Sequence, residues 1–258
     1  MKIYLTLVIC LGFLVDVKAQ ETEHLKYKIG KTSVTFEKTD FGENPRVLFF
    51  NMHEDESTSV VSAKPVLSQG GSFRLIALRH SGKRNLVFTR KGITYAVDPN
   101  RIYTKEGAKI TVERNSEKFS PYAVRKALKF SGKVRKKFVD KADYIVALHN
   151  NTPDNYSVLG YLPGGPDAPD VEDIYVNDTN DHDDFFYTTD KDFHEFAKSR
   201  GFNTVLQKPG LVRDDGSLSV YCGVKGKLYI NIEAEHGHVE MQQKMTEVVV
   251  EYLKKRYE

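Results

Sequence analysis

The chain is poor in cysteine, with only Cys10 and Cys222 among its 258 residues. Cys10 lies in an N-terminal segment that we expect to be removed, which leaves Cys222 as the one cysteine of the mature chain. A single cysteine excludes an intrachain disulfide, and it excludes a structural zinc site that needs two thiolates from this chain. The mature protein must therefore rely on its hydrophobic core, which a chain of this length can supply.

Neither sign of charge dominates the composition. Lys and Arg number 38 against 35 Asp and Glu, which gives a formal net charge of +3. Removing residues 1–20 takes away two lysines and one aspartate, which leaves 36 against 34 and a net charge of about +2. This balance gives no support for nucleic acid as a partner.

A hydrophobic run long enough to cross a membrane is also lacking. The longest apolar stretch runs from Ile3 to about Val15, short of the ~20 residues that a spanning helix needs. Lys2 precedes it and small Ala19 follows it, so residues 1–20 are predicted to be a secretory signal peptide cut after Ala19. The alternative is a membrane anchor. A signal peptide predicts a secreted or periplasmic protein with no stable membrane insertion after cleavage.

Repeats, low-complexity tracts and linkers rich in Pro, Gly or Ser are absent as well, so residues 21–258 are predicted to form a single domain. Apolar runs typical of strands alternate there with segments of helical periodicity. This alternation predicts an α/β fold, a three-layer sandwich with a mixed, largely parallel central sheet and helices on both faces. Strands are expected at 32–37, 46–51, 73–80, 86–90, the start of 93–103, 143–152, 203–207 and 228–238, and helices at 57–71, 120–142, 188–202 and 239–257. A turn that leads into a further strand is expected at 213–221.

The segment 120–142 combines helix signals with many basic residues. Ser120 is a capping residue and Pro121 suits the first helical position. Val124, Leu128 and Phe138 are expected to face the core while the lysines face water. The alternative is that this helix carries a basic binding face.

Histidines and acidic residues follow the carboxyl ends of three apolar strands. They are His53 and Glu56 after the first, His149 in the second, and Glu233, Glu235, His236 and His238 in the third. Ligand sites of open α/β sheets lie at the carboxyl ends of the strands. If these strands are parallel neighbours, the side chains meet in one place.

Such a set suits a catalytic zinc site, which has three protein ligands of His or carboxylate type and one open position. His53 and Glu56 form a His-x-x-Glu pair, His149 is a third ligand, and Glu233 is a carboxylate that can act as general base. Taken alone, each piece is more often a solvated loop or a hydrogen-bonded structural residue. The prediction of a Zn²⁺ site therefore rests on the combination of these residues.

A fourth element is Asp98-Pro99-Asn100-Arg101, which lies between the His-x-x-Glu pair and His149. The order His-x-x-Glu, Asp-x-Asn-Arg, His and late-strand Glu resembles two related families, the zinc carboxypeptidases and the succinylglutamate desuccinylase/aspartoacylase group. The resemblance spans residues 46–240.

The resemblance implies that Asn100 and Arg101 hold a substrate carboxylate, which a guanidinium can grip with two parallel hydrogen bonds. Arg90 is a candidate for a second substrate arginine. For the general base the choice is Glu233 over Glu235, because the desuccinylase pattern places the glutamate about four residues before a glycine, here Gly237.

The implied protein is an exported zinc-dependent hydrolase that cleaves an amide bond next to a free carboxylate, of the carboxypeptidase or acyl-amino-acid deacylase type. Its partner would be a small peptide or acyl amino acid. One alternative is a zinc-dependent cell-wall amidase, because "HNNT" at 149–152 is similar to an amidase His-x-Asn segment. Another is a non-catalytic protein of this fold that binds a peptide or glycan. The acidic stretch 177–190 is expected to be a loop at the cleft, with calcium binding as its alternative although EF-hand spacing is missing.

Overall fold

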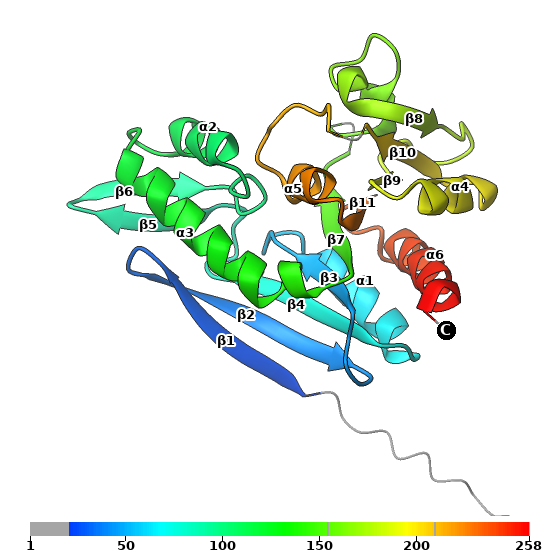
Figure 1. The fold of residues 1–258 in the computed structure, drawn as a ribbon, viewed down its shortest axis with the longest axis horizontal. Coiled ribbons are helices and arrows are strands. Elements are labelled where there is room, and N and C mark those ends of the chain that lie inside the picture. Colours follow the sequence, from blue (N-terminus) through cyan, green and yellow to red (C-terminus); the bar gives the residue numbers. More distant parts are fainter. Residues whose placement is uncertain (1–20, 154, 209, 258) are drawn as a thin grey trace, which may run out of the picture.

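The computed structural model describes residues 21–153, 155–208 and 210–257 (Figure 1). The predicted signal peptide, residues 1–20, lies outside the described part. Among the described residues, no helix combines the length and the apolar character that crossing a membrane requires.

The described chain alternates strands and helices along most of its length. The strands are β1 (Thr22–Ile29), β2 (Thr32–Phe41), β3 (Val47–Asn51), β4 (Phe73–Arg79), β5 (Leu86–Arg90), β6 (Ile93–Val97), β7 (Tyr144–Asn151), β8 (Val171–Tyr175), β9 (Phe185–Thr188), β10 (Asn203–Gln207) and β11 (Leu228–Glu235). The α-helices are α1 (Ser57–Ser68), α2 (Lys105–Asn115), α3 (Pro121–Lys137), α4 (Lys191–Ser199), α5 (Leu218–Lys225) and α6 (Val239–Tyr257).

Nine of the strands form one sheet in the order β1-β2-β4-β3-β7-β11-β9-β10-β8. The four central strands, β4, β3, β7 and β11, are all parallel to one another. Antiparallel pairings occur only outside this centre, and β5 and β6 form a separate hairpin. The predicted mixed sheet with a parallel centre is confirmed.

Helices cover both faces of the sheet, which is the predicted three-layer arrangement (Figure 1). On one face a core cluster joins the sheet to α2, α3 and α5. On the other face a second cluster joins it to α1, α4 and α6. The central strands are buried on both sides, which explains why β3 and β7 read as continuous apolar runs.

Helix α3 forms as its sequence predicts. The Ser120 hydroxyl accepts a hydrogen bond from the Tyr122 amide (3.2 Å), and Pro121 occupies the first turn, where no amide donor is needed. Val124 and Phe138 are buried in the core, whereas the lysines of the helix face outward.

Two predictions need correction, and one helix was missed. Residues 218–225, expected to enter a strand, form α5, because Ser217 caps the helix by accepting from the Val220 amide and Gly226 ends it in a left-handed conformation. Part of the expected acidic loop is β9, whose four residues are buried. Helix α2 was not predicted, since small residues such as Gly107 and Ala108 form much of its buried side.

A close approach of two glycines joins α2 to the loop before α5. A Cβ added to Gly107 would lie 2.1 Å from the Gly216 Cα, and one added to Gly216 would lie 2.5 Å from the Arg101 carbonyl oxygen. The Tyr103 amide also donates to the Gly216 carbonyl oxygen (2.9 Å). Only glycine fits at either position, so these two residues hold the loop against the segment that follows Arg101.

Candidate functional site

Three strand ends meet where the sequence analysis expected them to meet. Strands β3, β7 and β11 are consecutive parallel neighbours, so their carboxyl ends share one edge of the sheet. His53 and Glu56 follow β3, His149 lies in β7, and Glu233 lies in β11 directly opposite His149 in the register. Exposure is 0% for His53, 3% for His149, 5% for Glu56 and 7% for Glu233, so the group is almost completely buried.

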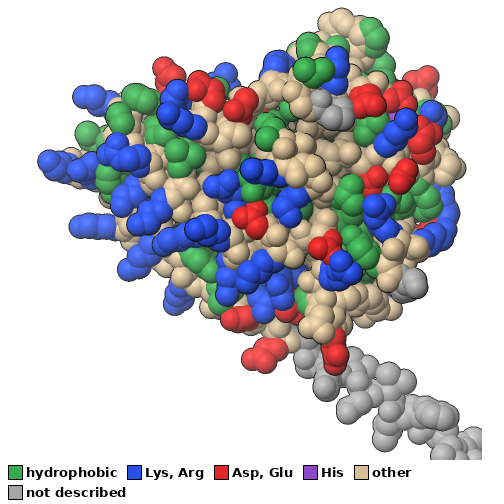
Figure 2. All heavy atoms as spheres, in the orientation of Figure 1, with side chains coloured by type: hydrophobic (Ala, Val, Ile, Leu, Met, Phe, Trp, Pro, Cys, Tyr) green, Lys and Arg blue, Asp and Glu red, His purple; other side chains and the backbone are tan. Residues whose placement is uncertain are grey.

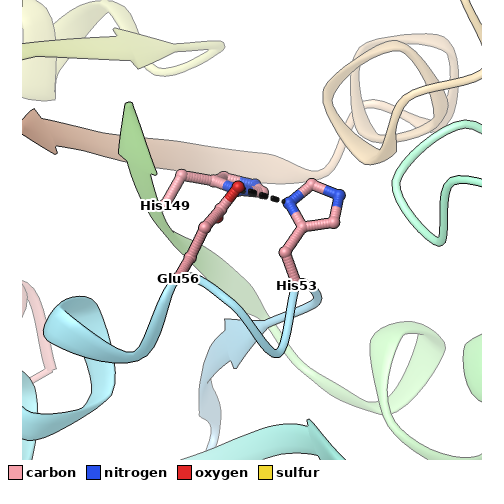
Figure 3. A group of neighbouring side chains, drawn as sticks. All are labelled: His53, Glu56 and His149. Carbon is pink, nitrogen blue, oxygen red and sulfur yellow. Dashed lines mark hydrogen bonds and ion pairs between the residues drawn. The ribbon is translucent and has the colours of Figure 1, made fainter. Parts of the chain in front are cut away.

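The His53, Glu56 and His149 side chains point toward one another (Figure 3). The Glu56 carboxylate lies 2.8 Å from His53 Nδ1 through Oε1 and 2.7 Å from His149 Nδ1 through Oε2. The two Nδ1 atoms are 3.2 Å apart. Ligands bound at ~2.1 Å to one tetrahedral zinc lie ~3.4 Å apart. Two nitrogens and a carboxylate in this arrangement match the donor set of such an ion.

Asp98 fixes the orientation of the His53 ring. Its Oδ1 lies 2.8 Å from His53 Nε2. The Asp98 carboxylate also accepts from the Asn100 amide (2.7 Å), and the Asp98 amide donates to Thr111 Oγ1 (2.8 Å). With the Nε2 proton donated to Asp98, the lone pair of His53 is on Nδ1, which faces the centre of the group. The sequence analysis named Asp98 as part of a motif but did not assign it this role.

Positive charge at the centre of the group stabilises the buried carboxylates in their ionised form. Burial alone would raise the pKa of Glu56, but His53 and His149 hold it well below its usual range. Burial alone would lower the pKa of His53, but Glu56 and Asp98 raise it to about 9. A divalent cation between these side chains would supply the same compensation.

Arg84 is a site residue that the sequence analysis missed. Its Nη1 donates to Glu56 Oε1 (2.5 Å) and its Nε lies 3.3 Å from Asp98 Oδ2. Arg84 lies in the β4–β5 loop, in a turn-like "SGKRN" stretch that carries no periodic or motif signal. Only the three-dimensional arrangement places its guanidinium beside two buried carboxylates.

Glu54, the acidic residue next to His53, anchors the loop that carries Arg84. Its Oε2 accepts hydrogen bonds from the backbone amides of His80 (2.6 Å), Ser81 (2.7 Å) and Gly82 (2.7 Å). Burial raises the pKa of Glu54, yet these three donors bring it below its usual range. Glu54 therefore stabilises the loop, whereas Glu56 lies at the candidate metal position.

Glu233 lies on the wall of the cavity beside His149. Its Oε1 accepts a hydrogen bond from Asn231 Nδ2 (2.8 Å), while Oε2 has no hydrogen-bond partner among the described residues. Burial raises the pKa of Glu233, and the nearby charge of Glu56 raises it further, against an opposing effect of His149. A carboxylate with a raised pKa and one free oxygen is suited to accept and release a proton.

Glu235, the alternative base, lies elsewhere. Its Oε2 is 3.3 Å from His238 Nε2, and its amide donates to Asp184 Oδ1 (3.0 Å). The Glu235 side chain does not line the cavity. Asp181 from the predicted acidic loop also approaches Glu235 and His238. Of the two glutamates, Glu233 therefore lines the cavity and Glu235 does not.

Asn100 and Arg101, which the resemblance assigns to a substrate carboxylate, both line the cavity. Asn100 Oδ1 accepts from the Leu218 amide (3.0 Å), and its Nδ2 lies 3.4 Å from His149 Nε2. Arg101 donates from Nη1 to the Asn100 carbonyl oxygen (3.1 Å), and its Nε lies 3.5 Å from Asp215 Oδ2. The Arg101 side chain is 37% exposed, so part of its guanidinium is accessible from the cavity.

Arg90 is not at the site. It ends strand β5, and its guanidinium lies over the Tyr122 ring of α3, 3.8 Å from the ring centre. It does not line the cavity, because the β5–β6 hairpin carries it to α3 instead. The arginine that does line the cavity in this part of the chain is Arg84, which is paired with Glu56 and Asp98.

The group opens into a cavity of about 1060 Å³. Tyr156, Tyr161 and Tyr187 line it as well, and Arg213 lies on its rim paired with Asp170. From the expected acidic loop at 177–190, only Tyr187 contributes to the wall. The cavity is large enough for a short peptide or an acyl amino acid.

The two asparagines of the "HNNT" segment form hydrogen bonds with neighbouring elements of the fold. Asn150 accepts from the Ser59 amide (2.9 Å) and donates to Gln242 Oε1 (2.9 Å). Asn151 donates to the carbonyl oxygens of Tyr156 (3.0 Å) and Asp183 (2.6 Å). These bonds tie β7 to its surroundings, and both asparagines also line the cavity.

No family model matches the chain, and no curated protein matches it. Among solved structures, 56 chains match. The murein-tripeptide amidase MpaA from Escherichia coli O157 is 11% identical, with 95% of this chain and 96% of that chain covered and a TM-score of 0.47. An aspartoacylase family protein from Mesorhizobium loti is 11% identical, with 92% and 68% covered and a TM-score of 0.43. A metallo-carboxypeptidase from Burkholderia cenocepacia is 12% identical, with 90% and 65% covered and a TM-score of 0.45.

These neighbours include the groups that the motif order resembles, the carboxypeptidases and the aspartoacylase family. Their identities and TM-scores are low, so they do not assign an activity to this chain.

Proposed function

We propose that the chain is a zinc-dependent hydrolase that cleaves an amide bond next to a free carboxylate. The observation that carries the proposal is the convergence of His53 Nδ1, His149 Nδ1 and the Glu56 carboxylate on a cavity wall, with Glu233 on the adjacent strand. This is the donor number of a catalytic zinc site, in which three protein ligands leave one position open.

The three donors fit zinc by type and by spacing. When bound, zinc supplies a Lewis acid for the scissile carbonyl and lowers the pKa of water toward ~7. His53 and His149 provide imidazole nitrogens, and Asp98 keeps the His53 proton on Nε2, away from that position. Glu56 adds one negative charge, and its Arg84 contact keeps the carboxylate oriented.

Glu233 is assigned the proton transfers. Its Oε2 is free to take a proton from water at the cavity wall, while Asn231 holds Oε1 and keeps the carboxylate in place. The raised pKa of Glu233 matches a group that accepts a proton during attack and returns it to the leaving amine.

Arg101 and Asn100 are assigned the substrate carboxylate. Both line the cavity on the same side as Asp98, and a partly accessible guanidinium can bind a carboxylate with two hydrogen bonds. Binding the carboxylate here would position the neighbouring amide bond at the His53, Glu56 and His149 group. We propose a small peptide or acyl amino acid as substrate, and an exported enzyme whose residues 1–20 direct secretion.

Metal analysis of the purified protein tests the proposal. We expect about one zinc per chain, a sharp loss of zinc in His53→Ala and in His149→Ala, and full zinc in the control His24→Ala, an exposed histidine of β1. A screen of peptides and acyl amino acids, with and without chelator, then identifies the substrate. If both ligand variants keep full zinc, the ligand assignment is wrong. If zinc is bound but no free-acid substrate is cleaved, the hydrolase assignment fails.

A further inference from the structure

Residues 118–141, which comprise α3 and its flanks, concentrate positive charge. They contain nine Lys or Arg residues and one acidic residue, a net charge of +8, whereas the whole chain has a net charge of +3. The remainder of the chain therefore carries −5. We call the basic side chains of this segment the basic face: Lys118, Arg125, Lys126, Lys129, Lys133, Arg135, Lys136, Lys137 and Lys141.

Four side chains of the basic face form one exposed row. Arg125, Lys129, Lys133 and Lys136 follow one another at helical spacing of three or four residues, and all four are exposed. Along the helix this row is about 16 Å long. Figure 2 shows Lys and Arg side chains gathered over α3 and the β5–β6 hairpin, with little acidic surface between them.

The charges of the basic face are not neutralised by the fold. In the described residues, none of the nine forms an ion pair with an acidic side chain. The nearby acids are engaged elsewhere: Glu117 accepts from the Thr94 amide and Asp140 accepts from the Tyr221 hydroxyl. Surface helices commonly offset lysines with glutamates three or four residues away, and α3 has no acidic residue at all.

The site already described does not use this surface. No residue of 118–141 lines the large cavity, so the basic face is not a pocket for a small anionic substrate. The basic face lies along one side of α3, where its charges can contact an extended partner. Phe119, at the N-terminal end of the row, is 46% exposed and adds an apolar side chain beside the charges.

We propose that the basic face binds the surface of a membrane that contains anionic phospholipids. A row of lysines attracts phosphate headgroups over a distance set by the Debye length, and a neighbouring exposed Phe can insert at the level of the headgroups. A single-stranded nucleic acid is less suited, because bases stack on interleaved aromatic side chains. Among the described residues of this face, Phe119 is the only exposed large aromatic residue. Binding through such a face is reversible and sensitive to salt.

Vesicle co-sedimentation of the signal-less chain tests the proposal. The probes are vesicles of phosphatidylcholine alone and vesicles that also contain phosphatidylglycerol. We expect binding to the second kind only, and its loss when salt rises from about 0.1 M to about 1 M, where the Debye length falls from ~10 Å to ~3 Å. Equal binding to both kinds of vesicle, or to neither, would overturn the proposal.

Charge-reversal variants locate the surface. K129E/K133E/K136E should weaken binding to phosphatidylglycerol vesicles by at least about a hundredfold. The matched control K64E/K191E/K244E makes the same change in net charge at exposed lysines of α1, α4 and α6, on the opposite face of the sheet, and should bind nearly as well as the parent. An equal loss in the control would mean that net charge alone, and not this face, governs binding.

Two further measurements keep the result decisive. Thermal unfolding checks that the triple variant is folded; if it is not, K129E and K133E are measured singly, each with an expected loss of about fivefold.

Soluble polyphosphate is the competing probe. If it binds the parent tightly while phosphatidylglycerol vesicles do not, the partner is a free polyanion and the membrane proposal is wrong. Phe119→Ser should weaken vesicle binding severalfold without changing polyphosphate binding.

Discussion

His53 Nε2 lies 2.8 Å from Asp98 Oδ1, on the side of the imidazole opposite the Glu56 carboxylate. Asp98 therefore holds a ligand of the proposed metal site without facing the metal position itself. Residues in that position orient the ligand and tune its basicity.

Asp98→Asn should weaken zinc binding by about 10- to 100-fold, because the amide keeps the shape of the side chain but loses the charge that fixes the His53 proton. Competition with a chelator of known affinity measures the effect. Asp178→Asn, at a side chain that is 93% exposed, is the control and should bind zinc like the parent. Parent-like zinc affinity in Asp98→Asn would show that Asp98 does not support His53.

Glu233→Gln should keep zinc and substrate affinity but lower turnover by about 10²- to 10⁴-fold, since the amide cannot accept the proton. The matched control is Glu235→Gln, whose side chain contacts His238 outside the cavity and whose loss should be mild. Steady-state kinetics and zinc content of both variants test this assignment. If Glu235→Gln is the inactive variant, the base has been assigned to the wrong residue of β11.

Arg101→Lys should raise KM for a free-acid substrate at least tenfold with a smaller effect on kcat, because an ammonium group keeps the charge but loses the two-point grip. The same substrate amidated at its carboxylate should be poor for the parent and little affected by the substitution. Arg90→Lys is the control, since Arg90 contacts Tyr122 and not the cavity. Equal turnover of free acid and amide by the parent would remove this role from Arg101.

Asp40 offers a test of pH-dependent stability away from the site. It accepts from Arg74 Nε (2.6 Å) and Nη2 (2.8 Å). Burial raises the pKa of Asp40, but the Arg74 guanidinium lowers it below its usual range overall. A carboxyl group whose pKa is lowered by folding stabilises the protein above its unfolded pKa of ~3.9, and this contribution is lost as pH falls through the folded value.

Asp40→Asn should therefore reduce the free energy of unfolding at pH 7 by about 0.5 kcal/mol, a discounted figure for a partly exposed pair. The difference from the parent should shrink as the pH falls below about 4. Urea unfolding at several pH values measures it, and a difference that stays constant down to pH 3 would contradict the assignment.

Local sequence signals predicted those parts of the fold in which one signal dominates. Continuous apolar runs located β3 and β7, and the Ser120-Pro121 pair located the start of α3. Helix α5 was mistaken for a strand because "LSVYCGVK" is apolar or small along most of its length, so its period is ambiguous, and the Ser217 cap was overlooked.

The candidate site followed from the sequence to the extent that its residues stand at strand ends. His53, His149 and Glu233 were identified because parallel neighbours bring such ends together, although their roles remain predictions. Arg84 was missed and Arg90 misplaced for one reason: both lie near the β5–β6 hairpin, and neither the path of a loop nor the direction of a hairpin is encoded in local spacing.

The contact between Gly107 and Gly216 makes two distant segments depend on each other. One segment follows Arg101, and the other carries Asp215 and leads to the Leu218 amide that holds Asn100. A side chain at either glycine would push the two backbones apart and move both proposed carboxylate-binding residues relative to His149. Homologues are thus expected to keep or lose this glycine pair together, and homologues that lack it should differ in the part of the substrate that Arg101 meets.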